Sequence, residues 1–131
     1  LLRTQSGVLR CARHRCDVLF VTLEKDEKDF TPTTLYNDYP LSQRRFHWES
    51  QRITRLESET GRRYRDPPPG WRILLFVRGT KRDERGLTAP YLFLGPVGCV
   101  SASGERPIQI VWELEREMPA GWFAAVKIAA A

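Results

Sequence analysis

The apolar residues of this chain fall in short runs of strand length, separated by segments rich in glycine, proline and charge. The clearest run extends from Ile108 to Leu114, where bulky apolar residues occupy every second position. A period of two residues is typical of a half-buried antiparallel strand. Similar β-branched and aromatic runs predict strands over residues 17–23, 33–39, 44–51, 71–78, 91–94 and 97–101. Short strands with little helix predict a mainly β (α+β) fold, either a small barrel or a strongly curved antiparallel sheet.

Two segments interrupt the strand pattern. Residues 52–70 are polar and end in the run Pro67–Gly70, which predicts a surface loop with at most one short helical turn. Residues 120–130 carry Trp122, Phe123 and Val126 at helical spacing, which predicts a short C-terminal helix, with an edge strand as the alternative. A chain of 131 residues with 41% hydrophobic residues can bury one core. We expect a single domain over residues 1–131, with its core at about 7–119 and a C-terminal segment at 120–131.

The N-terminus and the lengths of the apolar runs bear on whether the chain is part of a larger protein and whether it contacts a membrane. It does not begin with Met and has no signal-peptide pattern, so we expect a piece excised from a larger protein. Apolar runs such as Ile73–Val77 are far shorter than the roughly 20 residues of a transmembrane helix, so no membrane partner is expected.

The three cysteines are Cys11, Cys16 and Cys99. An odd number cannot all pair, which favours a reducing compartment, and we expect the cytoplasm. Cys11, His14 and Cys16 are residue types that bind zinc, but the spacing lacks a second ligand pair. A structural or incidental role is therefore preferred, and no metal or other cofactor is expected.

The polar residues include the types found in several catalytic sites. Asp38, His47 and Ser50 supply the residue types of a nucleophile triad, but no nucleophile-elbow sequence accompanies them. The neighbouring acidic residues of segments 57–59 and 83–84 lie in charged loops, where solvation is their ordinary role. No glycine-rich phosphate loop is present. The sequence predicts a non-catalytic module, with a nuclease or other hydrolase as an alternative.

The basic residues are segregated along the chain, which has a formal net charge of +5. Residues 1–16 carry four arginines and no acid, and residues 41–65 carry seven arginines against three glutamates. These stretches could form one basic face for a polyanion. Arginine forms bidentate contacts with phosphate and guanine, although the codon usage of a GC-rich genome would equally explain the excess of 17 Arg over 4 Lys.

Aromatic and polar side chains interleave with these arginines between Phe46 and Tyr64. In the strand over 44–51, Phe46, Trp48 and Ser50 share one face, and the polar residues share the other. Trp48 and Tyr64 could stack on a base or could belong to the core, while Ser50 and Gln51 could read a base edge. The predicted phosphate contacts are Arg44, Arg45, Arg52, Arg62, Arg63 and Lys81.

Seven short motifs together resemble a known family. They lie at residues 17–25, 34–39, 46–51, 60–64, 75–78, 91–96 and 107–112. Their order and content are similar to the domain of unknown function at the C-terminus of many bacterial DEAD/DEAH-box helicases, over about Gly7 to Pro119. This resemblance implies an accessory domain whose helicase motor lies elsewhere in the same polypeptide. Arg52-Ile53 departs from the small polar residues expected there.

The resemblance also implies a function. Accessory domains of such helicases would recognise double-stranded DNA, and the fold would be similar to PUA-like and SRA-like modified-base readers. A 5-substituted cytosine, either 5-methyl or 5-carboxyl, would be flipped into an aromatic pocket. A 5-carboxyl group would favour a cationic partner such as Arg78 or Lys81. The full predicted base-binding set is Tyr36, Asp38, Trp48, Ser50, Gln51, Tyr64, Arg78 and Tyr91.

An alternative is a regulatory domain that packs on its own helicase motor. Exposed apolar residues such as Trp122 and Phe123 would then form the contact. No small-molecule substrate is expected under either hypothesis.

Overall fold

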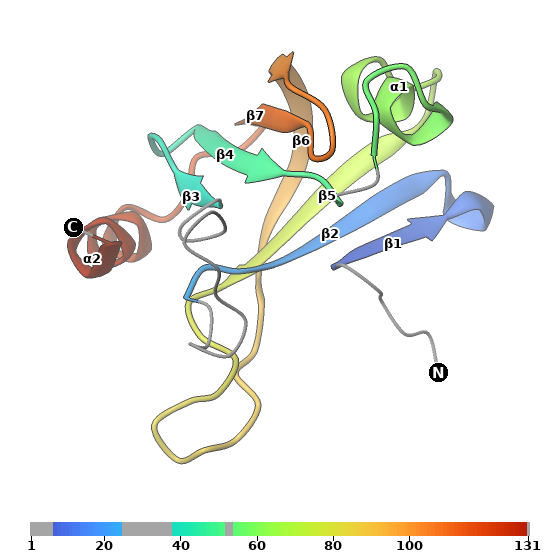
Figure 1. The fold of residues 1–131 in the computed structure, drawn as a ribbon. Helices are drawn as coiled ribbons and strands as arrows, with labels where there is room; N and C mark the ends of the chain where they lie inside the picture. The colour runs from blue at the N-terminus through green and yellow to red at the C-terminus, as the bar shows by residue number, and fades with distance from the viewer. Residues whose placement is uncertain (1–6, 25–37, 52–53, 131) are drawn as a thin grey trace.

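The computed structural model describes residues 7–24, 38–51 and 54–130, with side chains as far as Lys127. Its elements form mainly β structure with two short α-helices (Figure 1). The chain order is β1 (Val8–Cys11), the 3-10 helix η1 (Ala12–His14), β2 (Cys16–Thr22), β3 (Tyr39–Pro40), β4 (Arg45–Glu49), α1 (Glu59–Arg65), β5 (Arg72–Arg78), β6 (Leu92–Ser103), β7 (Gln109–Leu114) and α2 (Ala120–Ala130).

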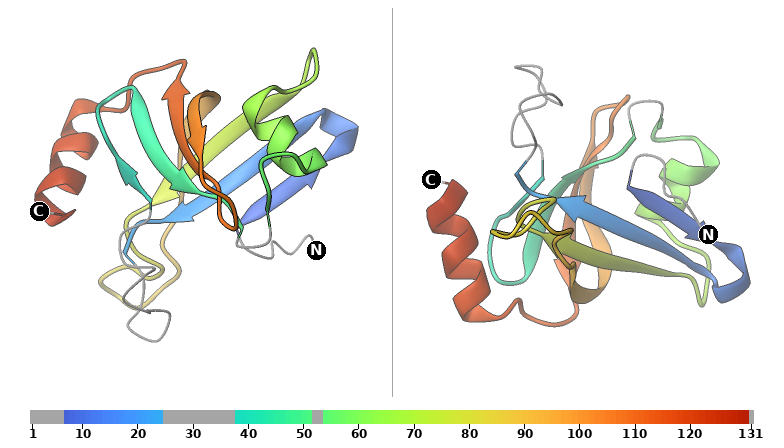
Figure 2. Two further views of the ribbon diagram at one scale, coloured as in Figure 1. Left: turned by 45° about the horizontal axis from the view of Figure 1, so that its top comes forward. Right: turned by 90° about the horizontal axis from the view of Figure 1, so that it is seen from below.

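The strands form one seven-stranded sheet in the order β1-β2-β5-β6-β7-β4-β3. The sheet curls around the core but does not close, because β1 and β3 each have one neighbour and form its edges (Figures 1 and 2). The predicted mainly β fold is confirmed. Of the two alternatives, the small barrel is not formed, and the curved sheet is mixed rather than antiparallel. β2 and β5 run parallel, and the chain between them, which includes β3, β4 and α1, provides the long connection that a parallel pair requires.

β6 differs most from its prediction. Gly95 and Pro96 predicted a turn between two strands, yet residues 92–103 form one continuous strand. The register with β5 shifts here: Leu75 pairs with Gly95, whereas Phe76 pairs with Phe93. The glycine adopts φ +96°, which accommodates this bulge inside the strand. β1 was not predicted, and the predicted strand over 33–39 lies outside the described residues except at its last two positions.

The core lies inside the curl and is built by alternate residues of the strands. Phe46 and Trp48 of β4 point inward, as the alternation predicts, and Ile110 and Trp112 of β7 join them. Helix α1 adds Tyr64 to the same core. The remaining buried apolar residues are Leu19, Val21, Ile73, Leu75, Val77, Leu94, Val97, Ile108, Leu114 and Met118.

Helix α1 is longer than the single turn predicted for residues 52–70. The Ser58 side chain caps it by accepting a hydrogen bond from the Gly61 N–H at 3.1 Å. Gly61 lies against the preceding loop, where a β-carbon would meet the backbone oxygens of Arg55 and Leu56. This close approach brings Tyr64 and Arg63 down onto the sheet.

The predicted C-terminal helix is confirmed as α2, which lies at the β3 side of the sheet (Figures 1 and 2). Trp122 and Phe123 are partly buried and pack against the core. Among the described helices, none is long and apolar enough to span a membrane.

Candidate nucleic-acid interface

Four of the predicted base-binding residues come together, but three of them, Trp48, Ser50 and Tyr64, are buried. The Trp48 side chain is 4% exposed and Tyr64 is fully buried. Their rings meet edge to face, with centroids 5.4 Å apart, and both contact Trp112. Of the two roles left open for these residues, the structure therefore places them in the core, and neither offers a ring face to a base.

The polar partners of this cluster are already engaged. The Gln51 side-chain oxygen accepts hydrogen bonds from the Tyr64 hydroxyl at 3.2 Å and the Thr54 hydroxyl at 3.1 Å. Ser50 Oγ accepts from the Ile108 N–H at 2.8 Å and donates to the Gln51 carbonyl at 3.1 Å. Burial raises the pKa of Tyr64 to about 12, against the smaller opposing effect of its bond to Gln51. These bonds hold α1 and the segment after β4 onto the core.

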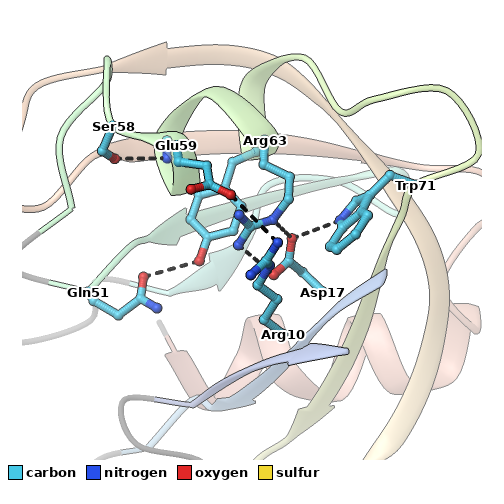
Figure 3. A network of polar contacts seen from close by, with 9 residues as sticks. Arg10, Asp17, Gln51, Ser58, Glu59, Arg63 and Trp71 are labelled. Atoms are coloured by element: carbon cyan, nitrogen blue, oxygen red, sulfur yellow. Dashed lines mark hydrogen bonds and ion pairs between the residues drawn. The ribbon is translucent and has the colours of Figure 1, made fainter. Parts of the chain in front are cut away.

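Arg63, a predicted phosphate contact, is also used internally. Its side chain is 8% exposed and that of Asp17 is 0% exposed. Arg63 donates from Nε and Nη2 to the two oxygens of Asp17, at 2.6 and 3.0 Å, and Trp71 Nε1 donates to the same carboxylate at 2.9 Å (Figure 3). The hydrogen bond to Asp17 raises the pKa of Arg63 despite its burial. The phosphate contact predicted for Arg63 stays a prediction; in this arrangement Asp17, a bidentate partner inside the domain, occupies its guanidinium.

Two other predicted residues, Arg78 and Tyr91, meet on the outer face of the sheet. The Arg78 guanidinium lies over the Tyr91 ring, 4.3 Å from its centroid. It donates to the Thr22 hydroxyl at 2.9 Å and to the Ala89 carbonyl at 3.1 Å. Both side chains are partly exposed. Their contacts fix the guanidinium at the ends of β2 and β5.

Three phenylalanines extend this surface across β2, β5 and β6. Phe20 stacks on Phe76 with centroids 5.3 Å apart, and Phe76 contacts Phe93 at 4.7 Å. Phe20 also meets the edge of Tyr91 at 5.2 Å. Phe93 is 46% exposed. We call Phe20, Phe76, Arg78, Tyr91 and Phe93 the outer aromatic face.

The loop between β5 and β6 projects from the body of the domain beside this face (Figures 1 and 2). Asp83 shapes it, because its Oδ1 accepts from the N–H groups of Arg85 and Leu87 at 2.9 and 3.0 Å. Leu87 is 54% exposed. The loop contains three basic residues, Lys81, Arg82 and Arg85, and two acidic residues, Asp83 and Glu84.

The remaining predicted phosphate contacts do not form one patch. Arg44 and Arg45 lie at the β3–β4 turn, and Arg62 lies on α1 at the other side of the sheet (Figure 1). All three are exposed; Arg44 is 3.7 Å from a carboxylate oxygen of Glu117, and Arg62 is 3.5 Å from Glu57. Lys81 lies in the β5–β6 loop.

Three further predicted site residues have other placements. Asp38 accepts a hydrogen bond from the Glu49 N–H at 3.0 Å and so supports the β3–β4 side of the sheet. Tyr36 and Arg52 lie outside the described residues.

The three phenylalanines and the Asp17 cluster were not predicted from the sequence. A signal for the phenylalanines was present: residues 18–21 and 73–77 are apolar at both odd and even positions, so each strand has an apolar outer side. The pairing of Asp17 with Arg63 joins residues 46 positions apart and has no local signature.

The described residues contain no group of three or more His, Cys, Asp or Glu placed to hold a metal ion. A search of the curated proteins found no match to the chain. A family model does match, over residues 3–126, and its description is a domain of unknown function, DUF3427. Because that match covers nearly the whole sequence, the chain belongs to the DUF3427 family.

Proposed function

We propose that this domain is a non-catalytic DNA-binding module and that the outer aromatic face is where it contacts DNA. The observation that carries the proposal is the Arg78 guanidinium stacked on Tyr91, which a row of ring contacts through Phe20 and Phe76 connects to the exposed ring of Phe93. Proteins that bind unstacked bases combine flat aromatic surfaces with cationic side chains. The projecting loop next to this face adds Lys81, Arg82 and Arg85 for phosphate contacts.

The same geometry supports a modified base as the ligand. A guanidinium has five N–H donors, and the bonds to Thr22 and Ala89 engage two of them within the described residues. The bonds hold the group in one orientation, so its other donors could bind a carboxylate with little loss of entropy. We therefore propose 5-carboxylcytosine over 5-methylcytosine as the preferred base, flipped onto Phe93 rather than into a Trp48–Tyr64 pocket.

The wider setting belongs to the same proposal. The strongly curved open sheet supports a relation to PUA-like and SRA-like readers, at the level of fold analogy. The sequence resemblance supports a helicase motor in the same polypeptide, which the reader would direct to modified DNA. The odd number of cysteines supports a cytoplasmic location.

Duplex binding measured by fluorescence anisotropy tests the proposal. Three duplexes that differ only at one cytosine (unmodified, 5-methyl and 5-carboxyl) are titrated at several salt concentrations. We expect affinity to fall with rising salt, because phosphate binding releases counterions, and we expect the 5-carboxyl duplex to bind most tightly. Equal affinity for the three duplexes would overturn the modified-base part, and affinity independent of salt would overturn the phosphate contacts.

The variant Arg78→Gln tests the site itself. Loss of a charged hydrogen-bonding partner should weaken binding of the 5-carboxyl duplex about tenfold or more and remove the preference among duplexes. Arg62→Gln is the matched control, since it removes the same charge from the exposed surface of α1 and should change affinity by less than about twofold. An equal effect of both variants would point to a diffuse charge effect. Tight binding of a helicase motor without DNA would favour the regulatory alternative.

A further inference from the structure

Cys11 and Cys16 face each other across the β1–β2 hairpin. Cys11 ends β1, Cys16 begins β2, and the two are directly paired in the antiparallel register. The turn between them is tight: η1 fills it, and Arg15 adopts φ 53° and donates its N–H to the Ala12 carbonyl at 3.1 Å. Directly opposed residues of an antiparallel pair have α-carbons about 4.5–5.5 Å apart, which lies within the span of a disulfide.

The two thiols are neighbours across the hairpin and unequal in exposure. Burial raises the pKa of the Cys16 thiol, and the neighbouring Cys11 thiol raises it further. Cys16 is 8% exposed, while Cys11 is partly open to solvent. A soluble reagent can therefore reach the Cys11 sulfur, while the Cys16 sulfur lies buried beside it.

We propose that Cys11 and Cys16 are a redox-modification site, which closes to an intramolecular disulfide when a low-molecular-weight disulfide is present. The Cys11 thiolate attacks one sulfur of the reagent, RSSR, so that a mixed disulfide forms and one RS⁻ leaves. Cys16 then loses its proton and attacks the Cys11 sulfur, which expels the second RS⁻. Two RSH are released, the two cysteines are oxidised, and the reagent is reduced.

The disulfide would stiffen one edge of the sheet. The turn that it closes carries Arg13 and Arg15, and β1 is an edge strand held by one neighbour. Asp17, which anchors Arg63 and Trp71, follows Cys16 directly. In a reducing compartment such a bond is transient and regulatory, which fits a pair held close but unbonded in the structure. This inference is independent of the DNA-binding proposal.

Thiol alkylation and mass spectrometry test the pairing. The reduced protein has three alkylatable thiols under denaturing conditions. After incubation with oxidised glutathione, we expect one alkylatable thiol, no retained glutathione and the loss of two hydrogen atoms. Trypsin cuts after Arg13 and Arg15, so the peptides of Cys11 and Cys16 should remain joined until dithiothreitol separates them.

Single variants complete the experiment. Cys99→Ser should still form the disulfide, because Cys99 lies on β6, away from the hairpin, whereas Cys11→Ser should not form it. A stable glutathione adduct on the wild-type chain, a disulfide-linked dimer, or linkage to Cys99 would each overturn the proposal. Peptide mapping of the wild-type chain distinguishes these outcomes even if a variant folds poorly.

Discussion

Arg63 illustrates how one buried contact decides the role of a residue. The side chains of Arg63 and Asp17 are at most 8% exposed, and two hydrogen bonds join them. Removing one partner leaves an uncompensated buried charge. We expect Arg63→Met to lower the free energy of unfolding by about 3–5 kcal/mol, measured by urea denaturation. Arg62→Met, one position earlier and exposed, should cost less than about 1 kcal/mol; equal losses would contradict a structural role for Arg63.

The buried hydroxyl of Tyr64 should make the domain less stable at alkaline pH. Its pKa is raised from 10.0 to about 12 by burial, so the folded state keeps a proton that the unfolded chain loses. Stability is therefore fully present below pH 10 and falls as the pH rises towards 12, by roughly 2–3 kcal/mol from this group. Tyr64→Phe should lower the free energy of unfolding by about 1 kcal/mol at pH 7, because the hydrogen bond to Gln51 is lost. The variant should also show a smaller decline in the free energy of unfolding between pH 10 and 12. Parallel pH curves for the two proteins would contradict this assignment.

At the scale of elements, strands with clear alternation were predictable and strand pairing was not. β4 and β7 follow their patterns because one side of each faces the core and the other faces solvent. The turn expected at Gly95-Pro96 did not form, since a bulge lets both residues stay within β6. The parallel pairing of β2 with β5 joins segments more than 50 residues apart, and composition within a strand does not specify its neighbour.

Helix α1 depends on a glycine for its position. A β-carbon at Gly61 would overlap the Arg55 carbonyl oxygen and lie 2.9 Å from that of Leu56. Gly61→Ala should displace α1 and lower the free energy of unfolding by about 1–3 kcal/mol, although alanine favours helix. Gly121→Ala in α2 is the control, because its β-carbon meets nothing within 4 Å and should be neutral or stabilising. Thermal unfolding measures the stability of both variants. An unchanged stability of Gly61→Ala would show that helix α1 can move away from the loop without cost.

At the scale of the whole molecule, the curl of the sheet decides which predicted site residues meet. Arg44, Arg45 and Arg62 are close in sequence, but β4 and α1 carry them to different sides of the domain (Figure 1). Arg78 and Tyr91 are joined instead, because the chain turns back from β5 into β6 and the guanidinium reaches the ring. Local composition therefore identified residue types suited to a nucleic acid, while their grouping depended on long-range pairing that a single sequence does not express.

The strand order predicts how stability is distributed over the molecule. β5, β6 and β7 are flanked on both sides, and each contributes residues to the core, whereas β1 and β3 have one neighbour each. Amides of flanked strands require larger opening of the sheet before they exchange. Native-state hydrogen exchange should therefore show Leu75, Val77 and Ile110 among the slowest amides, and Arg10 of β1 exchanging orders of magnitude faster. If β1 were as protected as β5, the hairpin would belong to the cooperative core, and disulfide closure at Cys11 and Cys16 would then add little rigidity to it.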